Sequence, residues 1–127
     1  MKFLPAITWF IITFILLTLP GSAFPKQSWL DNIQFDKIVH IALFAILVTL
    51  FFKPFIKAHT SNFKKKTQLI QIAGLAFVYG ILMEFVQKIW IPNRSFDFFD
   101  IVADGLGSFL PLLFFRQILK WGNKWTE

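Results

Sequence analysis

Four long apolar runs, separated by polar segments, constrain this chain more than any other feature. They occupy residues 3–19, 38–52, 69–90 and 98–115. A helix rises about 1.5 Å per residue, so runs of this length approach or match the ~30 Å apolar thickness of a bilayer. The second run is short and needs flanking residues to cross. We therefore expect an all-α integral membrane bundle of four transmembrane helices, over approximately residues 3–19, 37–53, 68–90 and 98–116, forming one domain of residues 1–127.

The composition agrees with a membrane protein and excludes any chemistry that needs cysteine. Only 16% of the residues are charged and 56% are hydrophobic, whereas soluble domains average about 25% charged residues. The absence of cysteine excludes disulfides and thiolate metal sites. The net charge of +6 would suit nucleic acid, but most basic residues flank the apolar runs. A membrane surface explains that arrangement better, so we expect membrane lipids and no nucleic acid as partners.

The distribution of basic residues predicts the topology. With both ends in the cytoplasm, the inner segments carry nine basic residues, which are Lys2, Lys53, Lys57, Lys64, Lys65, Lys66, Arg116, Lys120 and Lys124. The outer segments carry four, which are Lys26, Lys37, Lys88 and Arg94. Cytoplasmic segments are enriched in lysine and arginine, so the bias predicts that both termini are cytoplasmic.

A cleaved signal peptide is the rival interpretation of the first run. Lys2 would form its basic region, and Gly21-Ser22-Ala23 resembles a small-residue cleavage site. The apolar run is longer than that of a usual signal peptide, and one lysine is a short basic region. We therefore favour a retained helix.

Polar residues gather at one level once this topology is applied. The group comprises Asp36 and His40 at the start of the second run, Glu84 and Gln87 near the end of the third, Arg94 in the following turn, and Asp97, Asp100 and Asp104 entering the fourth. All lie within roughly two to three helical turns of the outer interface. Ionisable groups in lipid cost a few kcal/mol each, so we expect them to face one another in a cavity open to the outer side.

The same residues carry a family resemblance. The sequence resembles the VanZ-like family of small bacterial membrane proteins over roughly residues 30–115. The matching elements are Asp36-Lys37-x-x-His40, Glu84-x-x-Gln87, Arg94-x-x-Asp97-x-x-Asp100 and Gly107. Two positions depart from the pattern, because Asp104 stands where the family usually has Asn and Pro111 where it often has Gly.

The resemblance implies a location and a set of residues, and it implies no reaction. A VanZ-like protein would be a multi-pass protein of the bacterial cytoplasmic membrane. The family takes its name from an accessory protein of glycopeptide resistance clusters that is linked to teicoplanin. We therefore expect a binding or accessory protein for a cell-envelope lipid or a glycopeptide-related ligand. Arg94 would contact phosphate, because guanidinium suits phosphate oxygens.

Three alternatives remain open. The first is a small metal-assisted hydrolase or transferase for a lipid-linked phosphate, with His40 and Glu84 as base and acid and Asp100 and Asp104 holding a divalent cation. No nucleophile motif, HExxH pair or phosphate loop supports it. The second is a proton-coupled transporter. The third is structural, with Asp36 and Asp97 as helix caps.

The topology can be tested with a reporter that is active only in the cytoplasm. We expect activity when the reporter follows Glu127 or is inserted within residues 55–63, and silence when it is inserted at Trp29. An active fusion at Trp29 would contradict a four-span chain with both ends inside.

Overall fold

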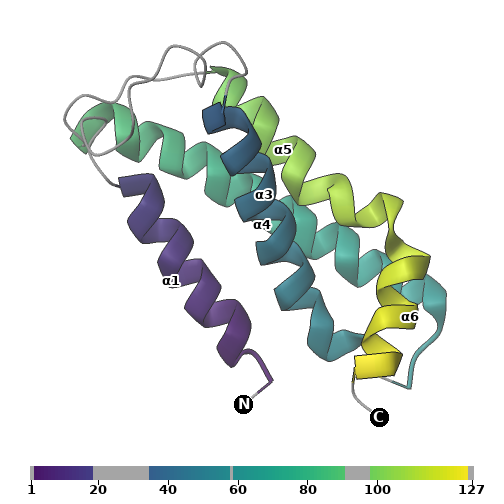
Figure 1. Ribbon diagram of the computed structural model, residues 1–127. Coiled ribbons are helices and arrows are strands. Elements are labelled where there is room, and N and C mark those ends of the chain that lie inside the picture. Colours follow the sequence, from purple (N-terminus) through teal and green to yellow (C-terminus); the bar gives the residue numbers. More distant parts are fainter. Residues whose placement is uncertain (1, 19–34, 58, 91–97, 126–127) are drawn as a thin grey trace.

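The computed structural model describes residues 2–18, 35–57, 59–90 and 98–125, and this part of the chain is helical, as predicted (Figure 1). The elements are α1 (Leu4–Thr18), α3 (Phe35–Phe52), the 3-10 turn η2 (Lys53–Phe55), α4 (Asn62–Trp90), α5 (Phe98–Leu113) and α6 (Phe115–Trp125). By length and composition, two segments can cross a membrane, Lys37–Phe55 and Asn62–Trp90. The pair α5 and α6 makes a third if it counts as one span. Helix α1 is apolar but has only 15 residues, so four spans remain a prediction.

Helix α4 presents an apolar face to the surroundings. Its exposed large side chains include Leu75, Val78, Leu82, Phe85 and Ile89, which recur at helical spacing along one stripe. Soluble proteins rarely expose contiguous apolar surface of this kind, because water penalises it. An exposed apolar stripe of this kind suits contact with lipid, which agrees with a membrane protein.

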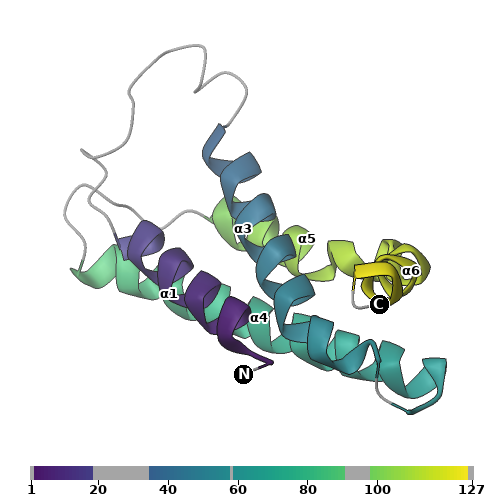
Figure 2. The same cartoon turned by 60° about the horizontal axis from the view of Figure 1, so that its bottom comes forward.

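The bundle is organised around α5, which packs against both α3 and α4, while α1 lies beside α3 and α4 (Figures 1 and 2). The core is formed by Leu43, Phe44, Leu47, Val48 and Phe52 of α3 with Leu69, Ala73 and Met83 of α4. The indole N–H of Trp9 donates to the Leu43 carbonyl at 3.0 Å, which ties α1 to α3. Thr8 and Thr18 of α1 donate to carbonyls of the preceding turn, so these two hydroxyls need no water.

Local sequence explains where α3 ends and α4 begins. Pro54 follows the last turn of α3, where proline cannot continue a helix. Ser61 caps α4, because its Oγ accepts the Lys64 backbone N–H at 3.2 Å. Helix α4 consequently includes Lys64, Lys65 and Lys66, which lie before the expected span of residues 68–90.

The fourth apolar run does not form one straight helix. Residues 98–116 were expected as a single span, but α5 ends at Leu113 and α6 continues at an angle of 65°. Pro111 lies inside α5, where it lacks a backbone N–H and its ring crowds the carbonyl four residues earlier. The Phe114 N–H bonds to the Pro111 carbonyl at 3.1 Å, a tighter turn than α-helix. The segment from Arg116, expected as a polar tail, is helical to Trp125.

Gly107 sets the distance between α5 and α3. A Cβ at this position would lie 2.4 Å from the Ile41 carbonyl oxygen. The obstacle is backbone, which cannot swing aside as a flexible side chain can. Close backbone approach at small residues is how helices associate in lipid, where burial of apolar surface gives little driving force.

We expect Gly107→Ala to lower the free energy of unfolding by about 1–3 kcal/mol, the usual cost of overpacking. Gly74→Ala is the matched control, because a Cβ at Gly74 meets nothing within 4 Å. That control should be neutral or stabilising, since alanine favours helix by up to about 1 kcal/mol over glycine. Unfolding by SDS titration in mixed micelles, followed by circular dichroism, measures both. Equal effects of the two substitutions would contradict this account of the α3–α5 contact.

Candidate functional site

Four polar side chains form a ladder between α3 and α5, which we call the polar ladder: Lys37, His40, Asp100 and Asp104. The Lys37 Nζ lies 2.7 Å from Asp100 Oδ1. The His40 Nδ1 lies 2.6 Å from Asp104 Oδ1, and its Nε2 lies 3.9 Å from Asp100 Oδ2. The pairs follow one another along both helices because α3 and α5 run parallel, so residues a turn apart on one helix meet residues a turn apart on the other.

The polar ladder reaches deep into the bundle. Asp104 is 1% exposed and His40 5%. Asp104 occupies the space above Gly80 of α4, where a Cβ would lie 2.7 Å from its Oδ2. Gly80 lies about 15 Å along α4 from Trp90, near the middle of the apolar run 69–90. Any side chain at position 80 would displace the carboxylate, so glycine there creates the room for Asp104.

Glu84 and Gln87 are both 1% exposed on the face of α4 that includes Gly80. Glu84 lies close enough to His40 to interact with it electrostatically, as Asp100 and Asp104 do. Gln87 instead contacts α1, because its side-chain amide donates to the Leu17 carbonyl at 2.7 Å. That carbonyl is among the last four of α1, which lack partners within their own helix. Gln87 therefore has a defined structural role at the end of α1.

Three of the expected site residues fall outside what the structure describes. Arg94 and Asp97 belong to the undescribed segment 91–97, and Asp36 lies in the first turn of α3 with a side chain that is not described. The positions of Arg94 and Asp97 in the expected cavity, and the opening of that cavity to the outer side, therefore remain predictions.

The described side chains of the polar ladder are joined by a hydrogen bond and by ion pairs. Among the described residues, no group of three or more histidine, aspartate and glutamate side chains is placed to hold a metal ion. The divalent cation considered for Asp100 and Asp104 thus gains no support from this part of the chain. The Asp104 carboxylate accepts the Nδ1–H of His40, which leaves Nε2 directed towards Asp100. A histidine oriented in this way by a carboxylate can give or take a proton at Nε2.

Sequence reasoning did not single out three buried hydroxyl groups, those of Thr13, Tyr79 and Ser108. Each has a side-chain oxygen that is buried and has no hydrogen-bond partner within the part of the chain that the structure describes. Ser108 follows Asp104 by one turn on α5, a spacing that could have drawn attention to it. Tyr79 lies between the rings of Phe10 and Phe44, with centroid distances of 4.7 and 6.0 Å, and only the tertiary packing of three helices brings it there.

Comparisons with known proteins add no relative. No family model matches the chain, and neither the curated proteins nor the solved structures provide a match. The arrangement of the polar ladder is therefore the basis for any statement about function.

A double-mutant cycle tests whether His40 and Asp104 act as a pair. We expect His40→Ala and Asp104→Ala each to lower the free energy of unfolding by about 3–5 kcal/mol, because each strands a buried polar group. The double variant should lose less free energy of unfolding than the two single variants lose together, and the difference, the coupling energy, should be about 1–3 kcal/mol. SDS titration of the purified variants measures these energies.

The matched cycle uses His40→Ala with Asp100→Ala. It should give a smaller coupling, because that contact is 3.9 Å long and Asp100 already pairs with Lys37. If the coupling energy of His40 and Asp104 is no larger than that of His40 and Asp100, the short contact between His40 and Asp104 does not stabilise the protein.

Proposed function

We propose that this protein is a VanZ-like, multi-pass protein of the bacterial cytoplasmic membrane, with four spans and both termini in the cytoplasm. The basic residues support this orientation. Lys53 and Lys64 mark the end of the bundle where α3 ends and α4 begins, whereas the acidic Asp100 and Asp104 lie towards the end where α5 begins. Positive charge is retained on the cytoplasmic side of membranes.

Its function is to bind the anionic headgroup of a cell-envelope lipid, or a glycopeptide-related ligand, at the outer side of the membrane. The observation that supports this function best is the polar ladder itself. Buried ionisable groups in a membrane bundle are costly, and such groups face bundle interiors and mark sites of ligand binding or proton movement. Elsewhere in the described bundle the helices are joined by an apolar core and by hydrogen bonds from Trp9 and Gln87 to backbone carbonyls, so packing alone does not require the ladder.

The roles follow from charge and position. Lys37, with a side chain 16% exposed, lies at the accessible end of the polar ladder and supplies positive charge towards a phosphate. Arg94 adds the guanidinium that binds phosphate oxygens in pairs. Asp100 holds the Lys37 ammonium in place, and Asp104 orients His40. Glu84 and His40 offer an acceptor and a donor to hydroxyl or amide groups of the ligand.

One observation favours a second candidate, an enzyme that transfers protons during cleavage of a lipid-linked phosphate. The 2.6 Å contact orients the His40 ring as a general base requires. In this reading Asp104 is the orienting group and Glu84 the acid. Release of phosphate from a lipid-linked phosphate by the purified protein, abolished in His40→Gln, would favour the enzyme over the binding protein.

Binding is tested with a polyprenyl pyrophosphate added to the protein in phosphatidylcholine nanodiscs. We expect the wild type to bind it, and Arg94→Ala and Lys37→Gln each to weaken binding about tenfold or more, because charged hydrogen bonds contribute about 1.5–3 kcal/mol. Lys88→Gln is the control, since it removes an exposed lysine from the last turn of α4 that is not part of the polar ladder.

Two results would reject the proposal. One is no measurable binding by the wild type. The other is an equal affinity in Arg94→Ala, Lys37→Gln and Lys88→Gln. Membrane abundance of every variant is measured in parallel, because a purely structural ladder would lower abundance and leave the affinity of the remaining protein unchanged.

A further inference from the structure

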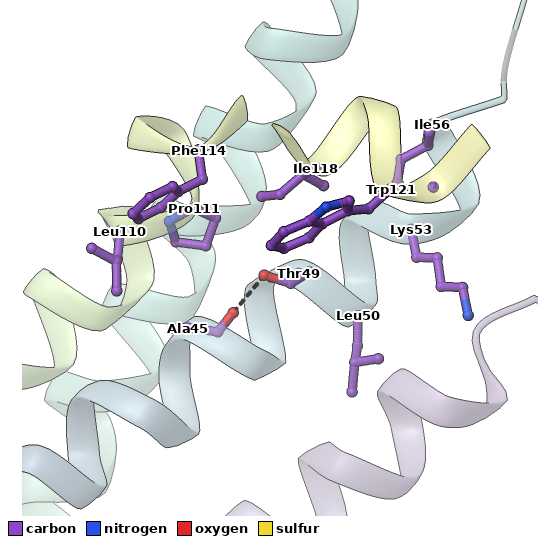
Figure 3. A pocket seen from close by; sticks show the side chains of 11 residues that line it. Ala45, Thr49, Leu50, Lys53, Ile56, Leu110, Pro111, Phe114, Ile118 and Trp121 are labelled. Carbon is purple, nitrogen blue, oxygen red and sulfur yellow. Dashed lines mark hydrogen bonds between the residues drawn. The ribbon is translucent and has the colours of Figure 1, made fainter. Parts of the chain in front are cut away.

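A second candidate binding site lies at the opposite end of the bundle from the polar ladder. It is a groove of about 420 Å³ between α3, α5 and α6, which we call the elbow groove because it lies beside the bend between α5 and α6. Figure 3 shows Leu110 and Pro111 at one end, Lys53 at the other, and Ile118 and Trp121 reaching from α6 towards Thr49. Its volume is in the range of small-molecule sites, about 300–1,000 Å³.

The break at Pro111 is what forms this groove. A straight continuation of α5 would carry the residues after Leu113 further along the bundle axis. The 65° bend instead carries α6 across the end of α3. Pro111 and Phe114 at the bend then become one wall, and Ala45 and Thr49 of α3 become the floor.

Helix α6 has two distinct faces that hold it at a membrane surface. Phe115, Ile118 and Leu119 pack against the core, while Arg116 and Lys120 are exposed. Helices with an apolar face and a basic face lie in the plane of the membrane interface. Trp121 is 54% exposed on α6 and lines the groove, and tryptophan favours the interface between lipid tails and headgroups.

The lining of the elbow groove is apolar apart from one charge. Lys53 is the single charged side chain among the described residues that line it, and it is exposed at the groove's end. A second cavity, about 360 Å³ between α1, α3 and α4, has a described lining without any charged residue. The elbow groove is thus the one of these two that combines an apolar channel with a cation at its mouth.

We propose that the elbow groove binds one anionic phospholipid, with an acyl chain along Leu110, Pro111 and Ile118 and the phosphate at Lys53. Charge complementarity selects this occupant. A lysine near the surface attracts anionic lipid by about 1 kcal/mol, and the neighbouring lysines 64–66 raise the local concentration of such lipids. The bend and the interfacial helix place the groove where tails meet headgroups. This site does not depend on the ligand proposed for the polar ladder.

The test is native mass spectrometry of the full chain released from nanodiscs that contain equal amounts of phosphatidylglycerol and phosphatidylcholine. We expect the wild type to retain one phosphatidylglycerol in preference to phosphatidylcholine. Lys53→Gln should reduce that preference about fivefold, the equivalent of one lysine–lipid attraction. Lys64→Gln is the matched control, because it removes an exposed lysine from the same end of the bundle outside the groove.

Substitutions that fill the groove distinguish lipid binding inside the groove from general attraction of anionic lipid to the basic surface. Ala45→Phe and Leu50→Trp each place bulk at the groove lining and should lower retention of phosphatidylglycerol at least as much as Lys53→Gln. Leu82→Phe adds the same kind of bulk on the lipid-facing side of α4, away from the groove, and should retain the lipid. Circular dichroism and gel filtration check that each variant is folded.

Three outcomes would overturn the proposal. Equal retention of the two lipids by the wild type would show that the protein does not prefer the anionic lipid. Equal loss in Lys53→Gln and Lys64→Gln would show general attraction to basic residues. Full retention in a folded Ala45→Phe or Leu50→Trp would show that the lipid lies outside the groove.

Discussion

The approach of α5 to α3 is the contact on which the rest of the bundle depends. Gly107 leaves no room for even one carbon beside the Ile41 carbonyl, so the two backbones are as close as helices can come. At this distance the short side chains of Asp100 and Asp104 can reach Lys37 and His40 directly. A wider separation would leave charged groups in an apolar bundle without partners, at a cost of several kcal/mol each.

The polar ladder and its glycines form one system. Gly80 gives Asp104 its space on α4, and Gly107 brings α3 within reach on the other side. A membrane bundle could pack without ionisable groups, since small residues and van der Waals contact suffice for helix association. The two carboxylates, the imidazole and the ammonium of the polar ladder are therefore not needed for packing alone, and this supports the proposal that they bind a polar ligand or move a proton.

The two ends of the bundle differ in character. At the end where α5 begins, charges are paired across helices and largely buried. At the other end they are exposed lysines and an arginine around the bend at Pro111, with Trp121 between them. The first arrangement suits recognition of a specific headgroup, whereas the second suits attachment to the membrane surface. Proline accounts for the second, because the 65° bend beside Pro111 turns α6 away from the axis of α5.

Much of the fold could be predicted from the sequence, because apolar runs of bilayer length leave few options other than helices. The spacing of Asp100, Asp104 and Gly107 alone places them on one face of a helix, since helical periodicity is a local property. The tertiary structure decided which partners that face meets: His40 pairs with Asp104, Lys37 pairs with Asp100, and Gln87 caps α1. It also decided that the last run bends, which apolar composition does not reveal. Depth along a helix can be counted along the chain, but the rotation and approach of neighbouring helices depend on side-chain shapes that meet only in three dimensions.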